Sequence, residues 1–186
     1  MEKTPVQIWE EFQKELKEND KKVKEEINKK SDKEKAKEFA LRWEKEAKND
    51  FGATRLAFDK PDSWSLKYNM VWDRVWGTGL FSQEFMDSEL NNNKKYFNKY
   101  GMPLDSRADY TKSDWLVWVA SMASDKKVFE EFIEPLWNAY NESSERVVLT
   151  DWYDTKSGNI VEFRHRSVQG GLFIKILMEK NVNGRK

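Results

Sequence analysis

The chain has 186 residues, about the length of one domain, and no Gly-, Pro- or Ser-rich linker divides it, so we expect a single domain over residues 1–186. Its 33 basic residues balance 33 acidic ones, and a chain without formal net charge offers little field to attract nucleic acid or a membrane surface. The absence of cysteine excludes disulfides, thiolate zinc sites and a cysteine nucleophile, and the single histidine, His165, argues against a Ser-His-Asp triad or a polyhistidine metal site. We expect no metal and no cofactor.

The N-terminal residues 1–35 are polar and rich in lysine, and we expect them to form a helical arm. Thr4 and Pro5 mark the start of a helix, and Gln7 stands where a capping box places its acceptor. Residues 17–38 are dense in Lys and Glu, which favours a solvated helix. The start of the chain lacks the apolar core of a signal peptide, and no apolar run is long enough to span a bilayer, so we expect a soluble chain.

Three more helices are predicted before residue 101. Residues 31–34 form a capping box, and apolar residues follow it at helical spacing over 36–47. After a loop over residues 51–64, a helix is expected to begin at a serine cap and to end near residue 77. The next helix is expected over residues 81–100, and a polar loop follows it.

The second half of the chain contains the most apolar helix. Residues 113–122 are apolar around most of the helix circumference, which is typical of a helix buried between neighbours. Another helix is predicted over residues 128–140, and Trp118 and Trp137 are expected in the core because both lie on helix-periodic apolar faces.

The last part of the chain mixes two patterns. Alternating residues on both sides of a turn at 156–159 predict a short β-hairpin near residues 148–165, with His165 in its second strand. Residues 172–178 predict a final helix. With about seven helices and no strict repeat, the predicted fold class is all-α, an array of antiparallel helical hairpins that includes this short β-hairpin.

Four segments carry a resemblance to a known family. Their sequences are WSLKYNMVWD (64–73), NKYGMPLDSRADYTKSDW (98–115), TDWYDT (150–155) and RSVQGG (166–171). In this order and spacing they resemble the helical domain of the glutaminase A family, over roughly residues 36–178.

The resemblance implies a partial α/α toroid, similar to six-hairpin glycosidase folds, and the hydrolysis of glutamine to glutamate and ammonia. Glutamine is then the expected small-molecule partner. Family members are typically secreted, although this chain shows no signal peptide. The upstream hairpins and the β-sandwich of family members have no counterpart here, so we expect a fragment whose open ends favour self-association.

Amide hydrolysis needs a nucleophile or an activated water, a proton donor for the leaving ammonia, and stabilisation of the oxyanion. Because cysteine is absent and histidine occurs once, we expect carboxylates to carry the proton transfer, since two neighbouring carboxylates split in pKa. The candidate catalytic residues in the matching segments are Asp73, Asp105, Asp109, Asp151 and Asp154.

A free amino acid as substrate also needs a guanidinium for its α-carboxylate and an anion for its ammonium group. Arginines and aspartates of the matching segments have this chemistry, and aromatic rings could line the walls. The candidate substrate-binding residues are Tyr68, Arg107, Asp114, Trp115, Trp152 and Arg166.

The same residues have structural interpretations that stay open. Asp62, Asp109 and Asp114 fit helix N-caps, and Arg107 and Arg166 fit ties between loops and helix ends. Aromatic rings with paired carboxylates also suit sugars, so a carbohydrate-binding or glycoside-processing toroid is one alternative function. A non-catalytic helical fragment or interaction module is the other.

Overall fold

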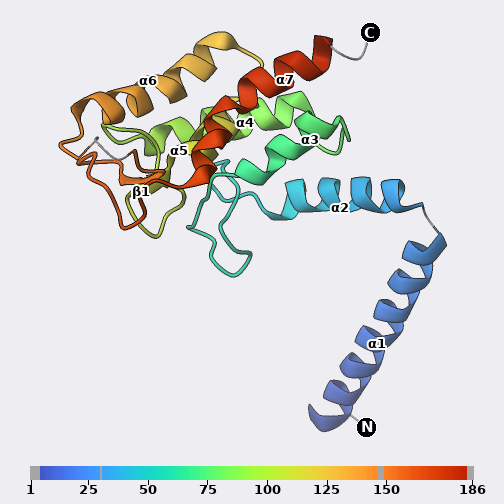
Figure 1. Ribbon diagram of the computed structural model, residues 1–186. Helices are drawn as coiled ribbons and strands as arrows, with labels where there is room; N and C mark the ends of the chain where they lie inside the picture. Colours follow the sequence, from blue (N-terminus) through green and yellow to red (C-terminus); the bar gives the residue numbers. More distant parts are fainter. Residues whose placement is uncertain (1–4, 30, 146–148, 184–186) are drawn as a thin grey trace. The chain divides into compact units, whose positions relative to one another are not determined.

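The computed structural model describes residues 5–29, 31–145 and 149–183, and over these ranges it contains seven α-helices and one two-stranded sheet (Figure 1). The chain groups into two compact units, Met1–Arg42 and Trp43–Lys186, whereas the sequence predicts one domain with an arm that ends at residue 35. The predicted fold class, mainly helical with a small β element, is confirmed.

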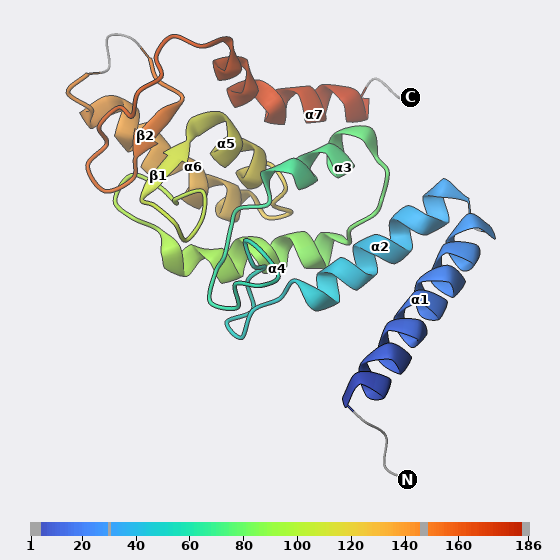
Figure 2. The same ribbon diagram turned by 90° about the horizontal axis from the view of Figure 1, so that it is seen from below.

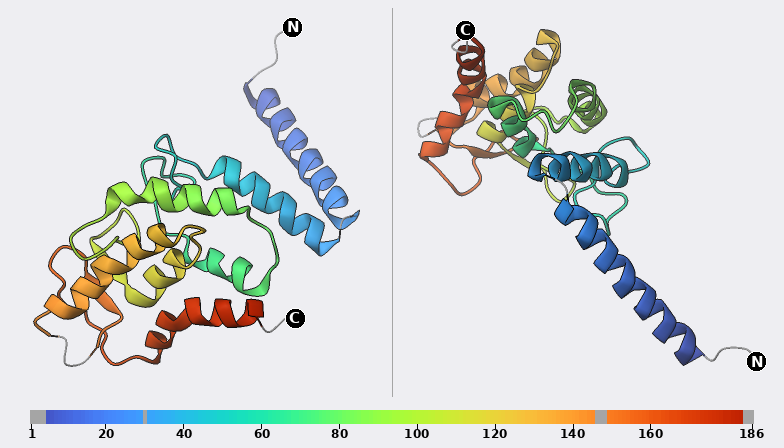
Figure 3. Two further views of the ribbon diagram at one scale, coloured as in Figure 1. Left: turned by 90° about the horizontal axis from the view of Figure 1, so that it is seen from above. Right: turned by 90° about the vertical axis from the view of Figure 1, so that its right-hand side faces the viewer.

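Helix α1 (Pro5–Lys29) belongs to the first unit, and Figure 3 draws it as one continuous rod. Pro5 occupies its first position, where a missing N–H costs no hydrogen bond. The expected cap, Thr4, lies outside the described residues. The Lys- and Glu-rich stretch after residue 17 is therefore helical, as its pattern predicts.

Helix α2 (Asp32–Glu46) begins in the first unit, and its last residues, 43–46, belong to the second. The predicted capping box is confirmed at its start. The backbone N–H of Ser31 donates to Oε2 of Glu34 at 2.9 Å, and the backbone N–H of Glu34 donates to Oγ of Ser31 at 3.4 Å. These two bonds satisfy donors that a helix start leaves without intrahelical partners.

The core of the second unit lies around α5 (Ser113–Ala120), which is buried as its apolar circumference predicts; Leu116, Val117, Val119 and Ala120 are all buried. Helix α5 packs against other elements of this unit on several sides (Figure 2). These neighbours are α6 (Lys126–Glu142), α7 (Ile174–Asn183) and the 3-10 helices η1 (Tyr68–Met70) and η3 (Ser167–Phe173). The other helices of the unit are α3 (Val71–Trp76), α4 (Gln83–Asn93) and the 3-10 helix η2 (Lys94–Tyr96).

The two tryptophans predicted for the core have different surroundings. Trp118 is partly buried against the core, and its indole N–H donates to the carbonyl oxygen of Gly171 at 3.1 Å. Trp137 is 64% exposed on α6, so its prediction as a core residue is wrong. Helical periodicity correctly predicts which side of α6 is apolar, but this side is wider than the surface that α5 covers, so Trp137 stays exposed.

The segment before η1 is extended, although the sequence predicts a serine-capped helix here. Ser65 forms a β-bridge with Asp105, and the backbone N–H of Leu66 donates to the carbonyl oxygen of Leu104 at 2.8 Å. These bonds to a distant segment replace the local bonds of a helix, so the helix begins later, with η1 and α3.

The only sheet in the described residues joins β1 (Tyr110–Lys112) to β2 (Trp152–Asp154) in antiparallel register. Thr111 stands opposite Tyr153, and both side chains are fully buried. The phenol of Tyr153 donates to the carbonyl oxygen of Tyr100 at 2.8 Å. Strand β1 lies in a segment that the sequence predicts as a polar loop.

The β-hairpin predicted near residues 148–165 is formed only in part. The backbone N–H of Asp154 donates to the carbonyl oxygen of Asn159 at 2.9 Å, and Tyr153 bridges Ile160, so the turn is present. The second strand is absent from the described residues, and His165 is exposed in irregular backbone. Glu162 and His165 have φ angles of 49° and 55°, in the left-handed region that interrupts extended backbone.

Candidate functional site

The four segments that carry the resemblance come together in the second unit. The first meets the second at the bridge between Ser65 and Asp105, and the second pairs with the third through β1 and β2. The fourth reaches the third through Arg166, whose Nε lies 3.7 Å from Oδ1 of Asp151. Side chains that are far apart in the sequence therefore share one region of the fold.

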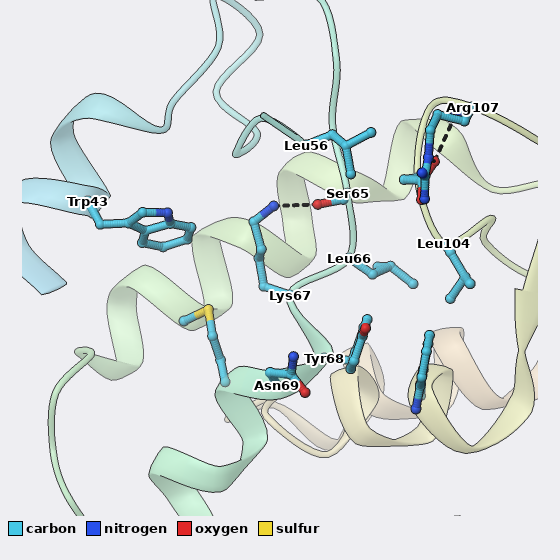
Figure 4. A pocket seen from close by; sticks show the side chains of 12 residues that line it. Trp43, Leu56, Ser65, Leu66, Lys67, Tyr68, Asn69, Leu104 and Arg107 are labelled. Carbon is cyan, nitrogen blue, oxygen red and sulfur yellow. Dashed lines mark hydrogen bonds and ion pairs between the residues drawn. The ribbon is translucent and has the colours of Figure 1, made fainter. Parts of the chain in front are cut away.

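A cavity of about 320 Å³ lies in this region, a volume within the range of small-molecule sites (Figure 4). Four of the predicted site residues line it: Tyr68, Asp105, Arg107 and Trp115. Residues outside the prediction also line it, among them Trp43, Ser65 and Lys67.

Asp105 and Arg107 form a bidentate salt bridge in the wall of the cavity. Nε of Arg107 donates to Oδ1 of Asp105 at 2.9 Å, and Nη2 donates to Oδ2 at 2.8 Å. Burial acts to raise the pKa of Asp105, but the hydrogen bonds and the charge of Arg107 outweigh it, so this pKa lies below its ordinary value. Asp105 is therefore held as an anion, and Arg107, 67% exposed, has more N–H donors than this pair uses.

Tyr68 and Trp115 form an aromatic wall. Their ring centroids lie 4.0 Å apart and their planes are 8° from parallel, so the two rings are stacked. Burial, helped by the charges of Asp105 and Asp114, raises the pKa of Tyr68. The phenol therefore stays protonated at neutral pH and remains a hydrogen-bond donor.

The side chain of Lys67 lies against that of Ser65 in the lining of the cavity, as Figure 4 shows. Its Nζ donates to Oγ of Ser65 and, at 2.8 Å, to the carbonyl oxygen of Arg55. Burial lowers the pKa of Lys67 to about 8, against the opposing charges of Glu89 and Asp105. A substantial fraction of this amine is therefore neutral slightly above neutral pH.

A buried charged cluster lies next to the aromatic wall. Asp151 is fully buried, and its Oδ2 lies 3.2 Å from Nζ of Lys112. This ammonium also lies 4.6 Å from the ring centroid of Trp152 and 5.7 Å from that of Trp115. Trp115 thus borders both the cavity and the cluster. The cluster brings together the predicted residues Asp114, Asp151, Trp152 and Arg166.

The two carboxylates of the cluster interact electrostatically. Burial raises the pKa of Asp114, and the negative charge of Asp151 adds to this effect. Oδ1 of Asp114 and Oδ1 of Asp151 are buried without a hydrogen-bond partner, an arrangement that is costly in a folded protein. Asp114 lies inside the first turn of α5, whose N-cap is Lys112, so its interpretation as an N-cap is wrong.

Asp73 lies in the first turn of α3 and does not line the cavity. Its Oδ1 accepts bonds from the hydroxyl of Thr78 and, at 2.9 Å, from the backbone N–H of Leu80. Its Oδ2 accepts from the backbone N–H of Phe81 at 3.3 Å. Both oxygens of Asp73 therefore hold the loop between α3 and α4.

Asp109 and Asp154 also have partners in a turn. Oδ2 of Asp109 lies 2.7 Å from Nζ of Lys156, and the hydrogen bond to this ammonium lowers the pKa of Asp109. Oδ1 of Asp154 accepts from the backbone N–H groups of Lys156 and Ser157, at 3.0 and 2.8 Å. Asp109 caps no helix, and both carboxylates stabilise the turn after β2.

A family model described as the glutaminase A six helical-hairpin domain matches residues 18–176. The chain belongs to the glutaminase A family. The match includes every predicted site residue. It begins inside the arm predicted for residues 1–35, so residues 18–35 are part of the region that matches the glutaminase A domain.

Two curated proteins of the glutaminase A family are similar to this chain. Glutaminase A of Aspergillus oryzae is 34% identical over 128 residues, which cover 67% of this chain and 18% of the relative. A protein of Arthroderma benhamiae, named "Probable glutaminase", is 30% identical over 183 residues, which cover 79% of this chain and 20% of the relative. The chain thus spans about a fifth of the length of these relatives. No solved structure matches it.

In the part of this glutaminase A family chain that the structure describes, no group of three or more His, Cys, Asp or Glu side chains is placed to hold a metal ion. Over the same residues, no helix has the length and apolarity needed to cross a membrane.

Ser65 and Lys67 line the cavity but were not among the site residues predicted from the sequence. Both lie in the first matching segment, WSLK, but the helix predicted there would place them on different faces. Extended backbone places the side chains of residues i and i+2 on the same side. A prediction of extended backbone for these four residues would therefore have placed Ser65 and Lys67 next to each other.

Proposed function

We propose that the second unit carries part of a binding site for L-glutamine and takes part in hydrolysis of the side-chain amide to glutamate and ammonia. Membership of the glutaminase A family and similarity to a protein named glutaminase A support this reaction. The observation that carries the proposal is the cavity itself, in which Tyr68, Asp105, Arg107 and Trp115 meet.

The charges in the cavity wall suit a free amino acid. In this proposal, donors of Arg107 that are not used by Asp105 bind the α-carboxylate of glutamine. Asp105, which Arg107 keeps ionised, supplies the negative charge for the α-ammonium group. The stacked rings of Tyr68 and Trp115 cover the aliphatic part of the substrate.

Binding tests this proposal directly. We expect L-glutamine to bind the full chain in calorimetric titration and the Arg107→Met variant to bind at least about 10-fold more weakly, because a charge-assisted contact is worth about 1.5–3 kcal/mol. Arg164→Met is the matched control, since Arg164 is exposed and pairs with Glu145 outside the cavity. Equal affinities for the unmodified chain and Arg107→Met would reject the assignment.

Hydrolysis is measured as ammonia released from L-glutamine, with L-asparagine as a shorter amide for comparison. The proposal expects release from glutamine and a lower kcat/KM for Arg107→Met. The sugar-binding alternative has less support, because Tyr68 stacks on one face of Trp115 and closes that face to a sugar. Tight binding of an oligosaccharide without binding of glutamine would favour this alternative.

A further inference from the structure

We propose that Ser65 is the nucleophile of the amide hydrolysis and that Lys67 is its general base. This inference rests on the proposed function and names the groups that carry out the reaction. It differs from the expectation that carboxylates carry the proton transfer.

The backbone holds the two side chains on one side of the cavity wall. The bridge from Ser65 to Asp105 and the bond from the N–H of Leu66 to Leu104 keep this segment extended. Side chains two residues apart then point the same way, and Nζ of Lys67 meets Oγ of Ser65 (Figure 4). A fixed contact between nucleophile and base is the first geometric requirement for an activated serine.

A second contact positions the amine. Nζ of Lys67 donates to the carbonyl oxygen of Arg55 at 2.8 Å. A neutral amine keeps N–H groups for this carbonyl and has one lone pair, which can accept the proton of Ser65. The same geometry therefore serves the protonated and the neutral amine, as a base that takes up and returns a proton requires.

Charge and burial suit the same role. Lys67 is partly buried, which favours its neutral form, while Glu89 and Asp105 are the anions that act on it. The pKa of about 8 that results lies close to neutral pH, where a general base is most effective. Asp105 is a poor base in comparison, because Arg107 holds its carboxylate with two hydrogen bonds.

The proposed reaction balances in two steps. Oγ of Ser65 attacks the side-chain amide carbon of glutamine, its proton passes to neutral Lys67, and the charged amine returns this proton to the nitrogen that leaves as ammonia. The resulting ester on Ser65 is then attacked by water. Lys67 takes the proton of this water and returns it to Oγ, so glutamate leaves and the serine is restored.

The oxyanion of each tetrahedral intermediate needs donors that are already in place. Tyr68, which stays protonated, and the side-chain amide of Asn69 both line the same cavity. Arg107 lies in the same wall and holds the other end of the substrate in this scheme.

Ammonia release from L-glutamine gives the first test, with Ser65→Ala and Lys67→Met in the full chain. We expect kcat to fall by at least about 100-fold in each. Matched controls are Ser106→Ala and Lys60→Met, two exposed residues that do not line the cavity, which should stay within about 2-fold. If the unmodified chain hydrolyses glutamine and Ser65→Ala does so equally well, the nucleophile assignment is overturned while the proposed function stands.

Reaction with phenylmethylsulfonyl fluoride, followed by peptide mass spectrometry, tests the pair without glutamine. We expect selective modification of Ser65, with a rate that rises through about pH 8 and falls at least about 10-fold in Lys67→Met. This result in a chain that neither binds nor hydrolyses glutamine would support the pair and reject the proposed function. Modification of Ser65 no faster than of Ser106 would overturn the pair.

A Ser65→Cys variant provides a further test in case other variants fail to fold. The chain contains no cysteine, so iodoacetamide would react with this one thiol. We expect the adjacent Lys67 ammonium to lower the apparent pKa of the thiol below its usual value of about 8.5, and Lys67→Met to abolish this effect. A pKa equal to that of a Ser106→Cys control would contradict the predicted contact.

Discussion

Lys112 and Asp151 form an ion pair in which Nζ lies 3.2 Å from Oδ2 and the carboxylate is fully buried. Arg164 and Glu145 form a pair at the same distance of 3.2 Å, but both of these side chains are about half exposed. The two pairs therefore differ mainly in their access to water. Burial makes the loss of one partner costly, because the remaining charge cannot be hydrated.

The first prediction is that Asp151→Asn destabilises the chain by about 3–5 kcal/mol. The substitution keeps the shape of the side chain but leaves the ammonium of Lys112, which is 14% exposed, without its anion. Urea denaturation followed by tryptophan fluorescence measures this change.

Glu145→Gln is the matched control for this buried pair, and we expect it to cost less than about 1 kcal/mol because exposed ion pairs contribute little. If Asp151→Asn and Glu145→Gln destabilise the chain equally, burial does not determine the strength of this interaction.

The second prediction concerns two adjacent glycines in η3. A Cβ on Gly171 would lie 2.8 Å from Cβ of Asp114 and 2.8 Å from Nε1 of Trp118, whereas a Cβ on Gly170 would meet no atom within 4 Å. We expect Gly171→Ala to destabilise the chain by about 1–3 kcal/mol through overpacking. Gly170→Ala should be neutral or slightly stabilising, and thermal denaturation compares the two. Equal melting temperatures would show that η3 can shift away from α5.

The sequence predicted the helices well because their signals are local. The capping box of Ser31 and Glu34 and the apolar circumference of α5 depend only on neighbouring residues, and both are confirmed. Strand β1 was not predicted, because its partner, β2, lies in a distant segment of the sequence. Three residues of alternating burial give little periodicity to detect.

The site was predicted only in part for a similar reason. Asp105 and Arg107 were predicted from their charge, and the fold does bring them into one cavity wall. Asp73 was predicted on the same basis, but its oxygens hold a loop instead. Lys67 was missed because a lysine gains a lowered pKa through burial, and burial depends on tertiary packing that no local pattern encodes.

The third prediction tests the structural position of Asp73. Asp73→Ala removes the acceptor for the N–H groups of Leu80 and Phe81 and for the hydroxyl of Thr78, so we expect a loss of about 2 kcal/mol of stability. The exposed loop residue Asp59 provides a control, since Asp59→Ala should change stability by less than about 0.5 kcal/mol.

If Asp73 also takes part in the reaction, the folded Asp73→Ala variant should lose kcat in the ammonia assay. We expect kcat to be retained at temperatures well below unfolding, because the carboxylate does not line the cavity. A folded variant without activity would contradict this expectation.

The last prediction follows from the pKa of Lys67, which lies at about 8 in the folded chain and at 10.5 for an unperturbed lysine. Between these two values the unfolded chain binds a proton that the folded chain has released, so the free energy of unfolding rises with pH. The stability of the unmodified chain relative to Lys67→Met should therefore increase from about pH 8 to pH 10.5, by on the order of 2 kcal/mol. Lys60→Met, which removes an exposed lysine, should follow the unmodified chain over the same range, and urea denaturation at each pH measures all three proteins. A constant difference between the unmodified chain and Lys67→Met would show that the pKa of Lys67 is not lowered, and the amine would then be protonated at the pH where a base is needed.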